Sequence, residues 1–177
     1  MTSQDRWVSR STAYVTPGVG DAWAAEAESR GAKAGQRLRE VGEVEPSRLV
    51  AEALAVAEGQ PVVVRRRVMS LDGRPVELTD SYYPVSIARG TRLAEARKIP
   101  GGAITLLAEL GHAPAHVREE VSARPATAEE RELLDLGQDD WVMVLFRLVS
   151  TADGTPVEAS AMTMIARGTR LGYERDL

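Results

Sequence analysis

The sequence lacks cysteine and long apolar runs, and each absence excludes a class of protein. Without cysteine among its 177 residues, the chain has no disulfide framework and no thiolate metal site, which fits a reducing compartment. The longest apolar runs, such as residues 141–146, are far shorter than the roughly 20 residues of a membrane-spanning helix. The N-terminus has no apolar core of signal-peptide length.

The balance of charge limits the function further. The 22 Lys and Arg residues are outnumbered by 26 Asp and Glu residues, which gives a net charge of −4. Surfaces that bind nucleic acid usually carry a strong basic excess instead. Apolar residues make up 44% of the chain and charged residues 27%, as is typical of a folded globular protein. We therefore expect a cytoplasmic domain that neither enters a membrane nor binds DNA by itself.

The chain contains an internal repeat. The segment Ile87–Leu93 recurs letter for letter as Ile165–Leu171, and the pattern Asp-Gly-x-Pro-Val-Glu begins at both Asp72 and Asp153. A long unit that is present only twice indicates a pseudo-twofold domain rather than a solenoid. The predicted ligand-binding domain spans residues 21–177, with half-repeats at about 21–98 and 102–177, after a linker-like segment of residues 1–20.

Each half is expected to form the same series of elements. A helix that ends at a glycine is followed by a strand, a second helix that begins after a proline, and a hairpin that turns at Asp-Gly. The expected ranges are helices at 21–30 and 103–110, strands at 36–45 and 115–124, second helices after Pro46 and Pro125 with Ser47 and Thr127 as caps, and hairpin strands at 61–71, 75–83, 141–151 and 156–165. Six strands connected in this way indicate an α+β fold with a largely antiparallel six-stranded sheet, barrel-like in shape, and with helices on one face.

Motifs for catalysis and for nucleotide binding are missing. The chain has no Walker loop, no dinucleotide-binding glycine pattern and no nucleophile elbow. Its two histidines, His112 and His116, are separated by Pro114 and follow the end of a predicted helix, so their spacing does not define one helix face. A metal site would also need a third ligand. We therefore expect no metal, no cofactor and no enzymatic activity.

Three consecutive arginines, residues 65–67, lie in an otherwise apolar predicted strand. Strand alternation places Arg65 and Arg67 on one face and the arginine between them on the other. One interpretation is an edge strand whose solvated arginines pair with Glu77. The other is that Arg67 faces a cavity and binds an anionic or polar ligand through its guanidinium. Arg147 stands at the equivalent position of the second half, which favours the second interpretation.

Two further groups are candidate ligand contacts. Ser81 and Tyr83 share one side of the next strand, where they form either a pocket wall or part of the core. Arg118 and Glu120 share one face of the strand that follows the first helix of the second half. They are either solvated or face the cavity beside Glu158.

The motifs occur in an order that is specific as a set. They are Arg67, Asp72-Gly-x-Pro-Val, Ser81-Tyr-Tyr-Pro84, Leu110-Gly111, the strand around Glu120, the helix 128–136, Arg147 and Asp153-Gly-x-Pro-Val-Glu158. Over about residues 20–175 this set resembles the UTRA domain, the effector-sensing half of GntR-type transcription regulators of the HutC subfamily. The resemblance implies a chorismate-lyase-like fold without lyase activity, a ligand cleft beside the sheet, and a homodimer.

In such regulators a small metabolite shifts the domain arrangement, and attached winged helices then release or hold the operator. The resemblance maps the ligand contacts onto Arg67, Thr79, Ser81, Tyr83, Glu120, Glu158 and Tyr173. Met69 stands where many members with phosphorylated ligands have a second arginine, and Thr79 where glutamate is common. Both departures favour an effector that is less charged than a phosphosugar. Only about 20 residues precede the resemblance, so DNA contact is expected only through a winged-helix domain absent from this chain.

Three functions remain as hypotheses. The favoured one is a sensor that binds a small metabolite without covalent chemistry. The second is a stand-alone dimerisation module whose cleft is filled by its own side chains and that pairs with a separate DNA-binding protein. The third is a chorismate-lyase-like enzyme, with Arg67 and Glu158 on either side of a closed pocket. No side chain stands out as a general base near neutral pH, which weighs against the enzyme.

Overall fold

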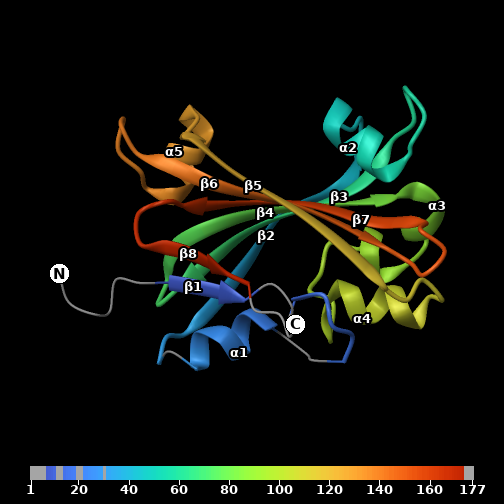
Figure 1. The fold of residues 1–177 in the computed structure, drawn as a ribbon, viewed down its shortest axis with the longest axis horizontal. Coiled ribbons are helices and arrows are strands. Elements are labelled where there is room, and N and C mark those ends of the chain that lie inside the picture. Colours follow the sequence, from blue (N-terminus) through green and yellow to red (C-terminus); the bar gives the residue numbers. More distant parts are fainter. Residues whose placement is uncertain (1–6, 11–13, 19–21, 30, 174–177) are drawn as a thin grey trace.

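The centre of the molecule is a six-stranded antiparallel sheet (Figure 1). A computed structural model describes residues 7–10, 14–18, 22–29 and 31–173. The strands are β2 (Ala34–Val44), β3 (Val62–Leu71), β4 (Arg74–Pro84), β5 (His116–Pro125), β6 (Trp141–Ser150) and β7 (Pro156–Ile165), in the spatial order β2-β3-β4-β7-β6-β5. All six predicted strands are present near their expected bounds. The predicted α+β class and the single antiparallel sheet are confirmed.

The two halves of the repeat meet in the middle of this sheet, where β4 pairs with β7. Glu77 and Glu158 are matching residues of the repeat, 81 positions apart. Asp80 and Ala161 are also 81 positions apart, and they lie directly opposite each other in the β4–β7 ladder. A pseudo-twofold axis therefore passes through this pair. On either side of it, β3 and β2 of the first half correspond to β6 and β5 of the second.

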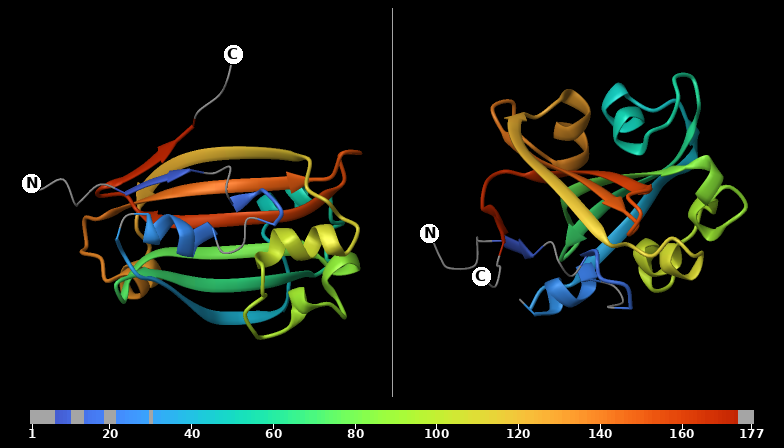
Figure 2. Two further views of the ribbon diagram at one scale, coloured as in Figure 1. Left: turned by 90° about the horizontal axis from the view of Figure 1, so that it is seen from below. Right: turned by 45° about the vertical axis from the view of Figure 1, so that its right-hand side comes forward.

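Helices cover both faces of the sheet, which corrects the expectation that they lie on one face (Figures 1 and 2). One face packs against α2 (Arg48–Leu54) and α5 (Ala128–Leu134). The other is covered by α1 (Ala22–Glu28), α3 (Val85–Ala88), the 3-10 helix η2 (Arg92–Ala94) and α4 (Gly102–Glu109). The reason lies in β3, where Val62 packs toward α2 while its neighbour Val63 packs toward α4. A strand that is apolar on both sides needs cover on both sides.

Two helices begin at the predicted caps. The hydroxyl of Ser47 accepts a hydrogen bond from the backbone N–H of Val50 at the start of α2. At the start of α5, Thr127 and Glu130 form a reciprocal capping box. Each cap satisfies backbone N–H groups that have no partner inside the helix.

Two short strands lie outside the main sheet. β1 (Trp7–Arg10) pairs in parallel with β8 (Thr169–Gly172). Neither strand is predicted by the sequence, in which residues 1–20 resemble a linker. The two copies of the repeated heptapeptide differ in structure. The second copy, Ile165–Leu171, ends β7, turns, and begins β8. The first copy, Ile87–Leu93, is helical on both sides of its glycine. Local sequence alone therefore does not determine the structure of this segment.

Candidate functional site

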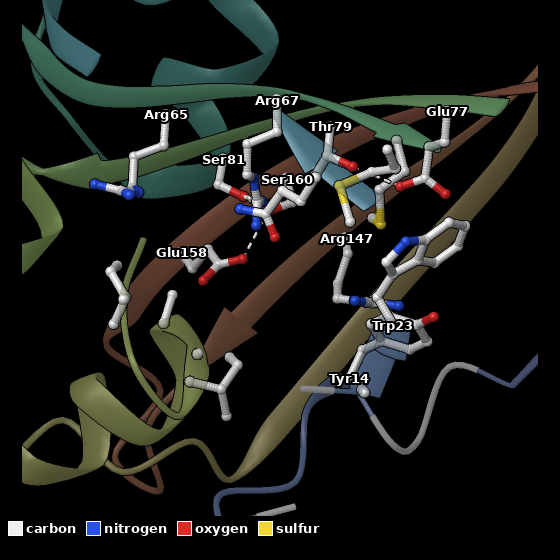
Figure 3. A pocket seen from close by; sticks show the side chains of 18 of the residues that line it. Tyr14, Trp23, Arg65, Arg67, Glu77, Thr79, Ser81, Arg147, Glu158 and Ser160 are labelled. Atoms are coloured by element: carbon white, nitrogen blue, oxygen red, sulfur yellow. Dashed lines mark hydrogen bonds between the residues drawn. The ribbon is translucent and has the colours of Figure 1, made fainter. Parts of the chain in front are cut away.

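A cavity of about 380 Å³ lies between the sheet and the layer that contains α1 and α4 (Figure 3). Its floor is formed by inward-facing side chains of β3, β4, β6 and β7. Its walls include Trp23 of α1, Tyr14 of the preceding segment, and residues 98–105 at the start of α4. A concave site with a few convergent polar groups is the usual form of a small-molecule pocket.

The repeat places the same three kinds of polar side chain in the cavity twice. The first half supplies Arg67, Glu77 and Thr79, and the second half supplies their counterparts Arg147, Glu158 and Ser160. In the first half, Thr79 Oγ1 donates to Glu77 Oε1 at 2.5 Å, and in the second, Ser160 Oγ donates to Glu158 Oε1 at 2.6 Å. Residues two apart on a strand share a face, so each glutamate and hydroxyl meet above the sheet.

A chain of hydrogen bonds links the two halves across the floor. Arg67 Nη2 donates to Ser81 Oγ at 2.7 Å, Ser81 Oγ lies 2.8 Å from Ser160 Oγ, and Ser160 donates to Glu158. We call these four residues the polar chain. Its two charged ends each keep a buried atom, Arg67 Nε and Glu158 Oε2, that has no hydrogen-bond partner among the described residues. Buried polar atoms without a partner are rare in folded proteins, so these two atoms mark the cavity as a candidate binding site.

Arg65 lies on the same face of β3 as Arg67, but its side chain stabilises the fold. It is only 2% exposed. Its Nη1 donates to the carbonyls of Leu93 and Glu95 at 2.9 and 2.7 Å, and its Nη2 donates to the carbonyl of Arg97 at 2.7 Å. Burial lowers the pKa of this guanidinium. Arg65 therefore holds residues 93–97 against the sheet and has few donors left for a ligand.

The interpretation of β3 as an edge strand whose arginines pair with Glu77 is wrong. β3 lies between β2 and β4. On the outer face, Arg66 pairs with Glu40 at 2.7 Å and with Asp80 at 3.2 Å. Glu77 lies on the cavity side, where burial raises its pKa against the lowering effect of the hydrogen bond from Thr79. Arg66 therefore pairs with Glu40 and Asp80 on the outer face, whereas Glu77 lies in the cavity.

Arg147, the counterpart of Arg67, is held by Glu119 and Tyr14. Its Nε donates to Glu119 Oε1 at 2.6 Å, and its guanidinium lies 5.9 Å from the ring centroid of Tyr14. Both side chains of the ion pair are nearly buried, at 7% and 10% exposed. Tyr14 also donates a hydrogen bond to Glu26 of α1. Arg147 therefore joins the floor of the cavity to the segment that precedes and includes α1.

The structure brings five of the eight predicted contact residues into the cavity lining, namely Arg67, Thr79, Ser81, Tyr83 and Glu158. Tyr83 is 1% exposed, and burial followed by the neighbouring Glu158 raises its pKa.

The other three predicted residues lie outside the lining. Arg118 and Glu120 point outward from β5, exposed, and lie 3.7 Å from each other. Tyr173 is largely exposed and lies beside Glu119. Partial desolvation, followed by that carboxylate, raises its pKa. Of the three acidic or basic residues 118–120, the one that faces inward is Glu119, which lies opposite Arg147 in the β5–β6 ladder. Glu119 shares its strand face with Val117 and Val121, and this apolar pattern was the signal, weak as it is on an edge strand, that could have identified it.

Sequence reasoning also missed residues that the repeat could have revealed. Ser160 is the counterpart of Thr79, and Glu77 is the counterpart of Glu158, so each follows from a residue already chosen. Trp23 and Tyr14 carried no such signal, because they precede β2, the first strand of the repeat, and reach the cavity only when the chain folds back over the sheet.

Metal and membrane signals are absent from the part of the chain that the structure describes. Within residues 7–10, 14–18, 22–29 and 31–173, no group of three histidine, cysteine or acidic residues could hold a metal ion. Over the same residues, no helix is both long enough and apolar enough to cross a membrane.

Comparison with known proteins gives concordant matches. A family model described as the UTRA domain matches residues 29–168. An uncharacterized HTH-type transcriptional regulator of Streptomyces coelicolor is 33% identical over 153 residues, which cover 85% of this chain and 56% of that protein. Another from Rhizobium meliloti is 34% identical over 148 residues, 79% of this chain and 60% of that protein. The chain thus spans little more than half the length of these relatives.

Solved structures share the fold. The effector domain of PhnF from Mycobacterium smegmatis superposes with a TM-score of 0.75 at 20% identity, covering 96% of this chain and 100% of that one. A chain described as a GntR-family transcriptional regulator superposes with a TM-score of 0.84 at 23% identity, covering 97% of this chain and 70% of that one. At these identities the similarity concerns the fold.

Proposed function

Because this chain belongs to the UTRA domain family, we propose that it is the effector-binding domain of a GntR-type transcription regulator of the HutC subfamily. Its relatives are named as transcriptional regulators, and one neighbour of the same fold is named as an effector domain. In this proposal the domain binds a small metabolite reversibly and does no covalent chemistry.

The observation that carries the proposal is the polar chain with its two unpartnered ends. Arg67 Nε and Glu158 Oε2 are buried beside an open volume of about 380 Å³. A buried polar atom without a partner costs about 1–3 kcal/mol, and a ligand that enters the cavity can remove that cost. The open volume also counts against a dimerisation module whose cleft is filled by its own side chains.

The same geometry supports a coupling between ligand binding and the arrangement of the segment around α1. The segment that precedes and includes α1 is held at three places in and around the cavity. Tyr14 lies over Arg147, Gly18 N–H donates to Thr105 of α4 at 3.2 Å, and Trp23 Nε1 donates to the carbonyl of Gly35 at 3.2 Å. A ligand that fits one arrangement of this segment better than another shifts the population toward it.

We further propose that the regulator acts in the cytoplasm as a homodimer. Operator contact would then be made by a helix-turn-helix region outside the part aligned here, because the aligned part covers only 56% and 60% of the two relatives. The acidic net charge of this chain, −4, agrees with a division in which another region binds DNA.

The test is binding by a metabolite panel, followed by calorimetry. A ligand of the folded state raises the melting temperature by mass action. Arg67→Ala should abolish binding of the compound found while leaving the fold intact, because Arg67 supplies the cavity-facing end of the polar chain. Arg118→Ala is the matched control, since that arginine is exposed and outside the lining. Unchanged affinity in Arg67→Ala would remove Arg67 from the site, and a panel without any binder would contradict the proposed function.

A further inference from the structure

The protons of the serine and threonine hydroxyls on the cavity floor are already donated to protein acceptors. A guanidinium can only donate hydrogen bonds and a carboxylate can only accept them. In the polar chain, Ser160 must therefore give its single proton to Glu158, and Ser81 must give its proton to Ser160. The lone pairs that Ser81 and Ser160 keep can only accept. The direction of every bond in the polar chain is thus set by the charges at its two ends.

The same holds at the other end of the floor. Thr79 donates its proton to Glu77 at 2.5 Å. Its two lone pairs, like the carboxylate beside it, are acceptors. The floor formed by β4 and β7 therefore offers a row of acceptors that runs through both halves of the repeat, since all of these residues line the cavity.

The two carboxylates on this floor form no ion pair with a described residue, although Arg67 and Arg147 lie near enough to Glu77 to act against the rise of its pKa by burial. Neither Glu77 nor Glu158 forms an ion pair within 4 Å with any residue that the structure describes. Glu158 is 7% exposed and its Oε2 lacks a hydrogen-bond partner among those residues. A buried carboxylate without an ion pair is stabilised by a hydrogen-bond donor that reaches it, and most strongly by a charged donor.

Four basic residues line the cavity, and three of them, Arg65, Lys98 and Arg147, already have protein partners. Arg65 donates to backbone carbonyls of residues 92–97. Arg147 is paired with Glu119 and lies over Tyr14. Arg67 uses Nη2 on Ser81, and its buried Nε has no partner among the described residues. An acid that bound this Nε would have to displace protein acceptors from Arg65 or Arg147 to bind a second arginine, and it would face the two carboxylates of the floor.

We infer that the effector presents hydrogen-bond donors, as hydroxyl or ammonium groups, to the acceptor row of β4 and β7, and that acids without such groups are not ligands of this cavity. This inference rests on the proposed function and adds the chemical class of the ligand to it. A volume of about 380 Å³ lies at the small end of ligand pockets, which range over about 300–1,000 Å³. The class is therefore that of a small polyol, an amino sugar or an amine.

The first experiment is a thermal-shift screen with compounds sorted in advance by their groups. One set carries hydroxyl or ammonium donors without an acid, a second set carries both, and a third consists of carboxylates and phosphates without either donor. Stabilising compounds are expected in the first two sets. Hits that are confined to the third set would overturn the inference and leave the proposed function standing. A screen without any hit would overturn the proposed function, and this inference with it.

The second experiment removes single donors from the best hit. The methyl ether of a hydroxyl keeps the oxygen acceptor but loses the donor, and a trimethylammonium group keeps the charge of an ammonium group but has no N–H. One such analogue is expected to bind at least about tenfold more weakly, the effect of about 1.4 kcal/mol. If all analogues retain the affinity of the parent compound in calorimetry, the donor assignment is wrong. Comparing hydroxyl hits with amine hits shows which of the two donors the site receives.

The third experiment changes the acceptors. Glu158→Gln has the same shape but no charge, and it should weaken binding of the best hit by about tenfold or more, because a charge-assisted bond is lost. Ser160→Ala serves as a second, smaller change on the same row. Glu120→Gln is the matched control, because Glu120 is exposed outside the cavity, and it should leave the affinity unchanged. Equal affinity in all three variants would refute the acceptor row as the binding surface.

Discussion

Arg65→Met tests whether the two inward arginines of β3 have different roles. Arg65 makes three short hydrogen bonds to carbonyls of residues 93–97, between 2.7 and 2.9 Å. Bonds with a charged donor contribute about 1.5 kcal/mol each at the low end of their range, which gives about 4–5 kcal/mol. Burial of the methionine side chain returns about 1.5 kcal/mol. We therefore expect a net loss of about 3 kcal/mol in the free energy of unfolding.

The assay is urea denaturation followed by circular dichroism, together with the melting temperature. For a domain of this size, about 3 kcal/mol corresponds to a fall of about 6–12 °C. Hydrogen exchange of residues 92–97 should also become faster, because their anchor on the sheet is gone.

The control for this prediction is the neighbouring arginine on the outer face. Arg66 pairs with Glu40, and both side chains are partly exposed, at 32% and 45%. Arg66→Met should cost less than about 1 kcal/mol, as is usual for such pairs. If the two variants lose the same stability, the carbonyl bonds of Arg65 do not hold the segment and the reasoning fails.

Two further predictions concern stability. Burial raises the pKa of Glu77 above its ordinary value of 4.5, so the folded state binds this proton more tightly than the unfolded state, and stability falls as pH rises through that window. The neutral Glu77→Gln should therefore raise the melting temperature at neutral pH but not below about pH 4, and a gain that is independent of pH would contradict this cause. Thr127→Ala should lower the free energy of unfolding by about 1 kcal/mol, because it removes the capping box with Glu130. Ser47→Ala should cost less, since its hydrogen bond is long at 3.4 Å, and denaturation curves that reverse this order would refute the comparison.

Much of the candidate site could be predicted because the repeat marks it twice. Arg67 and Glu158 were chosen on sequence, and their counterparts Arg147 and Glu77 prove to line the same cavity. What failed was the choice of face on β5. Edge strands are partly solvated on both sides, so the apolar alternation that identifies an inner face is weak there. Glu120 was therefore chosen where Glu119 is the residue that contacts Arg147.

The wall formed by Tyr14 and Trp23 was beyond sequence reasoning for a different reason. Their contacts with Arg147 and Gly35 join positions that the chain brings together only when the segment before α1 folds over the sheet. No periodicity within that segment encodes such a contact. The composition of the wall is thus a property of the tertiary structure.

The repeated heptapeptide shows where the boundary between sequence and tertiary structure lies. In both copies the sequence by itself determined a turn at glycine, and Gly90 and Gly168 adopt φ values of 77° and 83°, which side chains disfavour. The flanking residues have identical letters, yet Ile87–Leu93 forms helical turns packed under Arg65, whereas Ile165–Leu171 ends β7 and begins β8. Intrinsic propensities differ by less than the energy of packing, and so only the surrounding structure decided between helix and strand.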